Sequence, residues 1–172
     1  MLAPFPHHYS TSMCRSFASR TRSNAPPRFV LHGGPSPELG SDLAAWSPQH
    51  MLLSSLGLCL LNTFEAFAVR DRIELLDWRA KVSGVVDDTP EGPSFTSIVV
   101  ELDVEIAGQV DRFEAALDEA KRYCLVHNAL RVPVVVEAQI RTPGEPAVEL
   151  ADLGAQPPHD ARPAARPQLR AV

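Results

Sequence analysis

A long apolar segment in the middle of the chain, "MLLSSLGLCLLNTFEAF" at residues 51–67, limits the possible folds more than any other feature. Ser47 and Pro48 precede it and are typical of an N-cap and a first helical residue, because the hydroxyl accepts a free amide and proline lacks one. We therefore expect a helix from Pro48 to about Arg70. Its residues are apolar on nearly every side, so we expect burial on nearly every side, which favours a partner chain.

Polar residues decide whether this helix crosses a membrane. The segment is interrupted and then closed by Ser54, Ser55, Gly57, Asn62, Thr63, Glu65, Arg70, Asp71 and Arg72. A buried core helix fits that length and polarity better than a bilayer span. We expect no membrane partner.

Composition narrows the class of protein. The 172 residues are 45% hydrophobic and carry a net charge of −5. This predicts a globular domain, and with no polybasic run it gives no reason to expect nucleic-acid binding. Cys14, Cys59 and Cys124 are too few and too scattered for a secreted disulfide framework, and no cluster has metal-ligand spacing. The N-terminus has no Asp or Glu before Glu38 and imitates a transit peptide, but it also predicts a strand and a turn, so we expect a cytoplasmic protein. We expect no metal ion or prosthetic group.

Periodicity predicts the remaining elements. Apolar residues alternate with polar ones at residues 95–106, which predicts a strand with one wet face, formed by Ser97, Glu101, Asp103 and Glu105. A helix with one apolar stripe is predicted at Val110–Val126, with Cys124 at its end. Further strands are expected around residues 8–13, 28–32, 75–86 and 131–140, the last an edge strand because of Pro133.

The resulting order is β-β-α-β-β-α-β, which indicates an α+β fold around a long buried central helix. We expect one domain at residues 1–141. Residues 142–172 are rich in proline, alanine and arginine and predict a disordered tail.

Cys59 and Cys124 lie on the apolar faces of the two predicted helices. The two thiols could meet where these helices pack, and they could form a disulfide if the α-carbons came within about 7 Å. The alternative is that both are inert core residues, which is common for buried cysteines. His50 and His127 flank the two cysteine segments, where they could act on local electrostatics or, as we expect, cap helices or lie at the surface.

The motifs around the two cysteines resemble those of the OsmC/Ohr family of thiol-dependent peroxidases. "WSPQHMLLSSLGLCLLNTF" at 46–64 is followed by "AKRYCLVHNAL" at 120–130 and "VPVVVEAQI" at 132–140. The family has Ser/Asn-Pro-Glu at the start of a long helix, a cysteine ten residues after the Glu, and a second cysteine at the end of the next long helix. "GPSFTSIVVELDV" at 92–104 is similar to the family's strand after the hairpin. The resemblance covers roughly residues 5–141.

This resemblance implies an activity. Cys59 would attack the O–O bond of an organic hydroperoxide or hydrogen peroxide and become a sulfenic acid. Cys124 would condense with it to a disulfide, which an external dithiol would reduce. It also implies an intertwined homodimer with sites at the interface.

The chain departs from the family pattern at the group that tunes the thiolate. Gln49 stands where the family has a glutamate that holds an arginine beside the peroxidatic cysteine. Gln49 can accept a hydrogen bond from a guanidinium but brings no charge. Arg20 is the candidate arginine, with Arg15 and Arg22 as alternatives. Gln49 and Cys59 lie ten residues apart on one helix, about 15 Å, so a second protomer would complete the site.

Two other functions stay open. The helix pair could form a pocket that binds a hydrophobic ligand or senses redox state, with cysteines oxidised only as a signal, and Gln49 favours this alternative. The cysteines could also be inert in a purely structural dimer.

Overall fold

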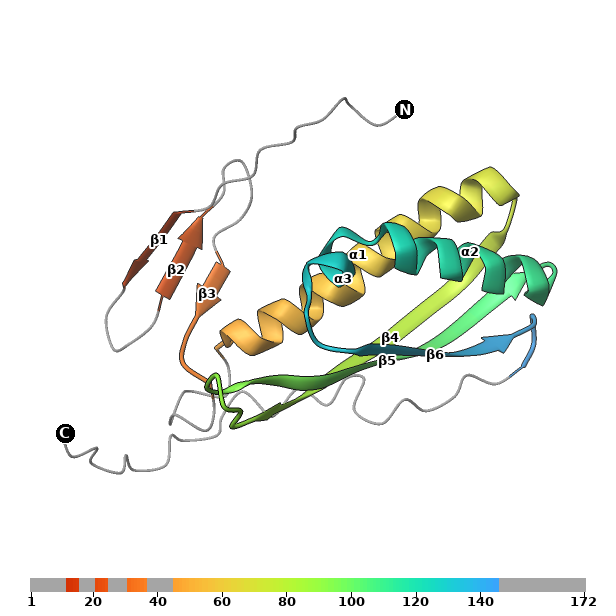
Figure 1. Ribbon diagram of the computed structural model, residues 1–172. Helices are drawn as coiled ribbons and strands as arrows, with labels where there is room; N and C mark the ends of the chain where they lie inside the picture. The colour runs from red at the N-terminus through yellow and green to blue at the C-terminus, as the bar shows by residue number, and fades with distance from the viewer. Residues whose placement is uncertain (1–11, 16–20, 25–30, 37–44, 146–172) are drawn as a thin grey trace, which may run out of the picture. The chain divides into compact units, whose positions relative to one another are not determined.

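The computed structural model of the chain describes residues 12–15, 21–24, 31–36 and 45–145 (Figure 1). The elements in chain order are β1 (Ser12–Arg15), β2 (Thr21–Asn24), β3 (Leu31–Gly33), α1 (Pro48–Asp71), β4 (Glu74–Asp87), β5 (Ser94–Ala107), α2 (Val110–Tyr123), α3 (Leu125–Ala129) and β6 (Val134–Arg141). The chain divides into two compact units between Met51 and Leu52, in the first turns of α1. The two units are described separately below.

The first unit contains an antiparallel three-stranded sheet in the order β1-β2-β3. Two strands were predicted here; residues 8–11 and 28–30 of those predictions lie outside the described residues. The predicted order was wrong in omitting β2, whose sequence Thr-Arg-Ser-Asn has no apolar alternation. Its strand conformation comes from backbone pairing with β1 and β3, which side-chain periodicity does not reveal.

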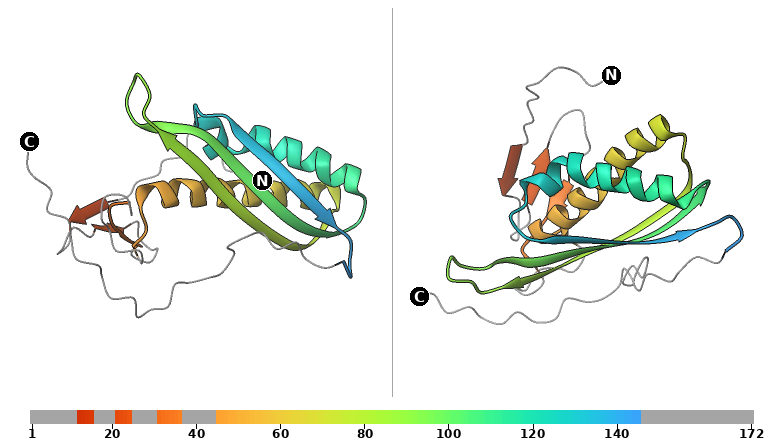
Figure 2. Two further views of the ribbon diagram at one scale, coloured as in Figure 1. Left: turned by 90° about the horizontal axis from the view of Figure 1, so that it is seen from below. Right: turned by 45° about the vertical axis from the view of Figure 1, so that its right-hand side comes forward.

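The second unit contains a three-stranded sheet in the order β4-β5-β6. β4 and β5 form an antiparallel hairpin, whereas β6 runs parallel to β5. The crossover from β5 to β6 carries α2 and α3, and α1 and α2 lie on the same face of the sheet (Figures 1 and 2). β6 is an edge strand, as Pro133 predicted, and the turn between β4 and β5 has Gly92 at φ 105°.

The core lies between the helices and the central strand. Alternate residues of β5 are all buried, and they are the ones predicted from periodicity: Ile98, Val100, Leu102, Val104 and Ile106. Phe64 of α1 fills the space between the layers, with its ring centroid 5.2 Å from that of Trp78 and 4.9 Å from that of Phe113. Gly57 allows α1 to approach β4 closely, since an added Cβ would lie 3.1 Å from Val82.

Helix α1 is buried along one stripe only, formed by Leu56, Leu60, Phe64 and Ala68. On the opposite side Leu58 is 60% exposed and Val69 is 81% exposed. By length and composition alone, α1 is long and apolar enough to cross a membrane. The expectation of burial on nearly every side is therefore not met within the described part of one chain.

The predicted second helix ends earlier than expected. α2 stops at Tyr123, Cys124 is extended (φ −68°, ψ 109°), and α3 begins at Leu125. The apolar stripe of the sequence continues through this break, because Val126 still packs against the core. A helical period therefore cannot distinguish one helix from two helices that bury the same side.

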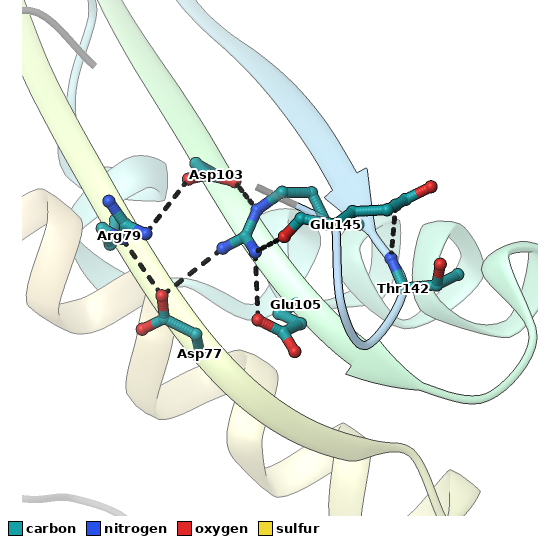
Figure 3. A network of polar contacts seen from close by, with 7 residues as sticks. Asp77, Arg79, Asp103, Glu105, Thr142 and Glu145 are labelled. Carbon is teal, nitrogen blue, oxygen red and sulfur yellow. Dashed lines mark hydrogen bonds and ion pairs between the residues drawn. The ribbon is translucent and has the colours of Figure 1, made fainter. Parts of the chain in front are cut away.

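The outer face of the sheet carries a network of ion pairs that corrects the expectation of a wet face (Figure 3). Asp103 of β5 is fully buried, and Arg141 of β6 donates to it through Nε at 2.5 Å. Arg141 also donates to Glu105 at 3.0 Å, and Arg79 of β4 lies 3.8 Å from Asp103. Buried carboxylates are retained where cations and hydrogen bonds compensate for lost water, and β4 and β6 supply those cations from either side.

We predict that Asp103→Ala lowers the free energy of unfolding by about 2 kcal/mol or more, because it leaves the Arg141 guanidinium buried without its nearest carboxylate. Glu101→Ala is the matched control, two residues away on the same face, where the ion pair with Lys81 spans 4.0 Å and is half-exposed. The control should cost less than about 1 kcal/mol. Urea denaturation measures both values, and equal losses would contradict the assignment.

Candidate active site

Cys59 lies near the middle of α1 and packs, half-buried, against the core of the second unit. One turn later, the Thr63 hydroxyl donates to the Cys59 carbonyl oxygen at 2.7 Å. This bond occupies the Thr63 hydroxyl at the backbone. The position of the Cys59 thiol is thus set by a regular helix that is held on the sheet by Leu56, Leu60 and Phe64.

Cys124 is the single residue between α2 and α3, and it is fully buried. Its carbonyl oxygen accepts from the Asn128 amide at 3.0 Å, the first hydrogen bond of α3. Tyr123 and Leu125 on either side of it are exposed, whereas Val126 and His127 are half-buried. The sharp change of chain direction therefore places this side chain inward.

The structure brings these two thiols together as neighbours. Burial, together with the hydrogen bond and charge of the Cys59 side chain, raises the pKa of the Cys124 thiol to about 11, against the lowering effect of the His127 and Val126 amides. Neither cysteine is in a disulfide, so the structure has two free thiols beside each other. Cys124 is the thiol that its surroundings keep protonated.

The start of α1 holds the other predicted motif. The Ser47 side-chain oxygen accepts from the His50 amide at 3.3 Å and lies 2.7 Å from His50 Nδ1, so Ser47 is the N-cap that the sequence predicted. Gln49 is exposed in this first turn, ten residues before Cys59 on the same helix, which corresponds to about 15 Å along the axis. Its predicted role at the thiolate stays a prediction.

Arg20, the predicted arginine, lies outside the described residues. Of the alternatives, Arg15 ends β1 and Arg22 lies in β2. Cys14 is in β1, opposite Arg22 in the strand register. Among the described residues no group of three or more histidine, cysteine or acidic side chains could hold a metal ion.

Two residues of α3, His127 and Asn128, contact backbone carbonyls near the end of α2, and only His127 was singled out from the sequence. His127 Nδ1 lies 2.9 Å from the Lys121 carbonyl oxygen, and Asn128 Nδ2 donates to the Arg122 carbonyl at 2.8 Å. The capping role expected for His127 is therefore present, whereas His50 lies at the surface with its ring against the Ser47 side chain. Asn128 was missed, because it lies within α3, five residues after the end of α2.

We predict that the Cys124 thiol makes the free energy of unfolding fall at alkaline pH. A raised pKa means that the folded chain binds more protons than the unfolded chain between pH 9 and about 11, so the free energy of unfolding falls as the pH rises through this range. In Cys124→Ala this part of the fall should vanish. Urea denaturation of reduced protein at several pH values tests this, and parallel pH profiles for the two proteins would contradict it.

Comparison with solved structures finds the same fold in several bacterial proteins. An OsmC-like protein from Vibrio cholerae superposes with a TM-score of 0.72 at 17% identity, covering 78% of this chain and all of that one. An organic hydroperoxide resistance protein from Legionella pneumophila gives 0.59 at 22% identity, covering 78% and 98%, and one from Elizabethkingia anophelis gives 0.61 at 13%, covering 80% and 99%. A search of curated proteins finds no match.

The family comparison covers most of the residues that the structure describes. The model of the family described as OsmC-like protein matches residues 40–139, which include the start of α1, both thiols and nearly all of β6. This match and the shared α+β fold agree with the resemblance seen in the two cysteine motifs. The chain belongs to the OsmC-like protein family.

Proposed function

We propose that this chain is a thiol-dependent peroxidase that reduces organic hydroperoxides or hydrogen peroxide. The observation that carries the proposal is the pair of neighbouring free thiols, Cys59 on α1 and Cys124 at the corner of α2 and α3. Two relatives of the same fold are described as organic hydroperoxide resistance proteins. Two thiols that are neighbours in space, in partly apolar surroundings, suit the two-electron reduction of a peroxide by cysteine without a metal.

The proposed reaction has three balanced steps. The Cys59 thiolate attacks the O–O bond, so that the sulfur gains one oxygen as a sulfenic acid and the remaining oxygen leaves as an alcohol, or as water from hydrogen peroxide. The Cys124 sulfur then attacks Cys59, the S–S bond forms, the S–O bond breaks and water leaves. An external dithiol finally reduces the disulfide and becomes oxidised itself.

The order of the two thiols follows from their surroundings. Cys124 is fully buried and its pKa is raised, so it is poorly suited to attack a peroxide. It stays protonated beside Cys59 until the sulfenic acid has formed. Cys59 is less buried than Cys124. We assign the attacking role to Cys59 and the resolving role to Cys124.

A thiolate in apolar surroundings needs a nearby cation. We propose Arg20 for this role, with Gln49 accepting one of its hydrogen bonds, and with Arg15 and Arg22 as alternatives. Since Gln49 lies about 15 Å from Cys59 along α1, we propose that two chains share each site. The exposed Leu58 and Val69 give α1 an uncovered apolar side that a second copy would bury.

Gln49 also favours a second candidate, a non-catalytic protein that senses redox state or binds a hydrophobic ligand. An amide without charge holds an arginine less firmly than a carboxylate does, so the thiolate would react slowly. In this case the disulfide would form as a signal and would not turn over.

Stopped-flow mixing of the reduced protein with an alkyl hydroperoxide tests the proposal. We expect Cys59 to react on the order of a hundred times faster than free cysteine, or more, because the thiolate is both ionised and positioned. Mass spectrometry should find a Cys59–Cys124 disulfide in the wild type and a trapped sulfenic acid at Cys59 in Cys124→Ser. Cys59→Ser should be inactive, while Cys14→Ser is the matched control and should behave as the wild type.

Reaction no faster than that of free cysteine would reject the peroxidase and leave the sensor. Arg20→Gln, Arg15→Gln and Arg22→Gln then identify the cation: the variant that slows sulfenic acid formation without changing disulfide formation from the sulfenic acid is the one beside Cys59. If all three match the wild type, the cation is not one of these arginines.

We predict that Leu58→Asp converts a dimer to a monomer, because a carboxylate on this side of α1 would be buried without a partner. Analytical ultracentrifugation measures the mass. Val85→Asp is the control: Val85 is 56% exposed but pairs with Ser97 on the sheet face away from the helices. Loss of the dimer in the control, or its persistence in Leu58→Asp, would contradict the interface.

A further inference from the structure

The corner between α2 and α3 leaves several backbone groups to be satisfied. The last four carbonyls of a helix have no amide partner within that helix. α2 ends at Tyr123 and only Cys124 separates it from α3, so the carbonyls of Lys121 and Arg122 face the turn. Such a corner needs other donors to hold its shape.

Two side chains of α3 provide these donors. His127 Nδ1 is 2.9 Å from the Lys121 carbonyl oxygen. A carbonyl can only accept, so Nδ1 carries the proton and donates it. Asn128 Nδ2 donates to the Arg122 carbonyl at 2.8 Å, and Asn128 is exposed whereas His127 is half-buried. Water competes less for the bond of His127, which therefore contributes more to holding α3 on the end of α2.

The position of α3 matters for the thiol beside it. The amides of His127 and Val126 lower the pKa of Cys124 against the stronger effect of burial. Amides that follow a residue at a helix start favour a negative charge on its side chain. They do so only while the turn stays closed, and the same His127 that supplies one amide also closes the turn through its ring.

We propose that His127 is a positioning residue for the resolving step: its imidazole fixes α3 on the end of α2, so that the amides after Cys124 face its sulfur as that sulfur attacks Cys59. The inference rests on the proposed function, because it assigns a role within the second step of that reaction. In this step Cys124 loses its proton, the S–S bond forms and water leaves from the sulfenic acid. His127 contacts neither the peroxide nor the reacting oxygen in this scheme.

The step-by-step kinetics test this role in the Cys14→Ser protein. His127→Ala should leave the rate of sulfenic acid formation unchanged and slow disulfide formation on the order of threefold to tenfold, as expected for up to one unit in the pKa of the resolving thiol. More sulfenic acid should be trapped and more sulfinic acid should form at high peroxide. His127→Asn should restore the rate, because the Asn Nδ2 can donate from the place of Nδ1. Asn128→Ala is the matched control and should have the smaller effect.

A second measurement does not need peroxide. In Cys14→Ser/Cys59→Ser the thiol of Cys124 is the only one left, and its ionisation is followed by thiolate absorbance at 240 nm. His127→Ala should raise the pKa of Cys124 and His127→Asn should return it. An equal pKa in all three proteins, or a failure of Asn to restore either readout, would overturn the positioning role. If the wild type does not react with peroxide, the proposed function is wrong, and the absorbance titration still decides the effect of His127 on Cys124.

Discussion

The contact between α1 and the inner face of β5 underlies the rest of the structure. Every fourth residue of α1 from Leu56 to Ala68 is buried, and every second residue of β5 from Ile98 to Ile106 is buried opposite. Phe64 lies at the centre of this layer between Trp78 and Phe113. Close packing of this kind fixes the rotation of the helix about its axis, because a turn by one residue would expose Phe64.

The candidate site depends on that rotation. With Leu56, Leu60 and Phe64 on the sheet, Cys59 lies at the side of α1, where α2 and α3 reach it. The crossover from β5 to β6 brings Cys124 to the same place, and the parallel pairing of β6 with β5 anchors the end of that crossover. Two thiols that are 65 residues apart in sequence thus become neighbours, because α1 packs on the sheet and the crossover from β5 to β6 returns beside it.

Much of the architecture could be predicted from periodicity. α1, β4 and β5 begin and end within one residue or so of the expected positions, because long regular patterns and the Ser47-Pro48 start carry a strong local signal. Short or polar elements could not be predicted in this way. β2 pairs through its backbone with β1 and β3, and the break at Cys124 keeps the same side buried on both of its helices. Asp103 was assigned to the wet face because its cations, Arg79 and Arg141, come from other strands.

The sequence by itself determined that the chain has an α+β fold with an apolar helix that carries Cys59. Apolar spacing and helix caps are local signals, which can be recognised without knowing what each segment packs against. The sequence also determined the family through the spacing of its two cysteine motifs. Only the tertiary structure decided that the thiols are adjacent, that Cys124 is held protonated, and that His127 closes the turn beside it. These properties are set by distances between segments far apart in the chain, and burial and charge act on a thiol through those distances alone.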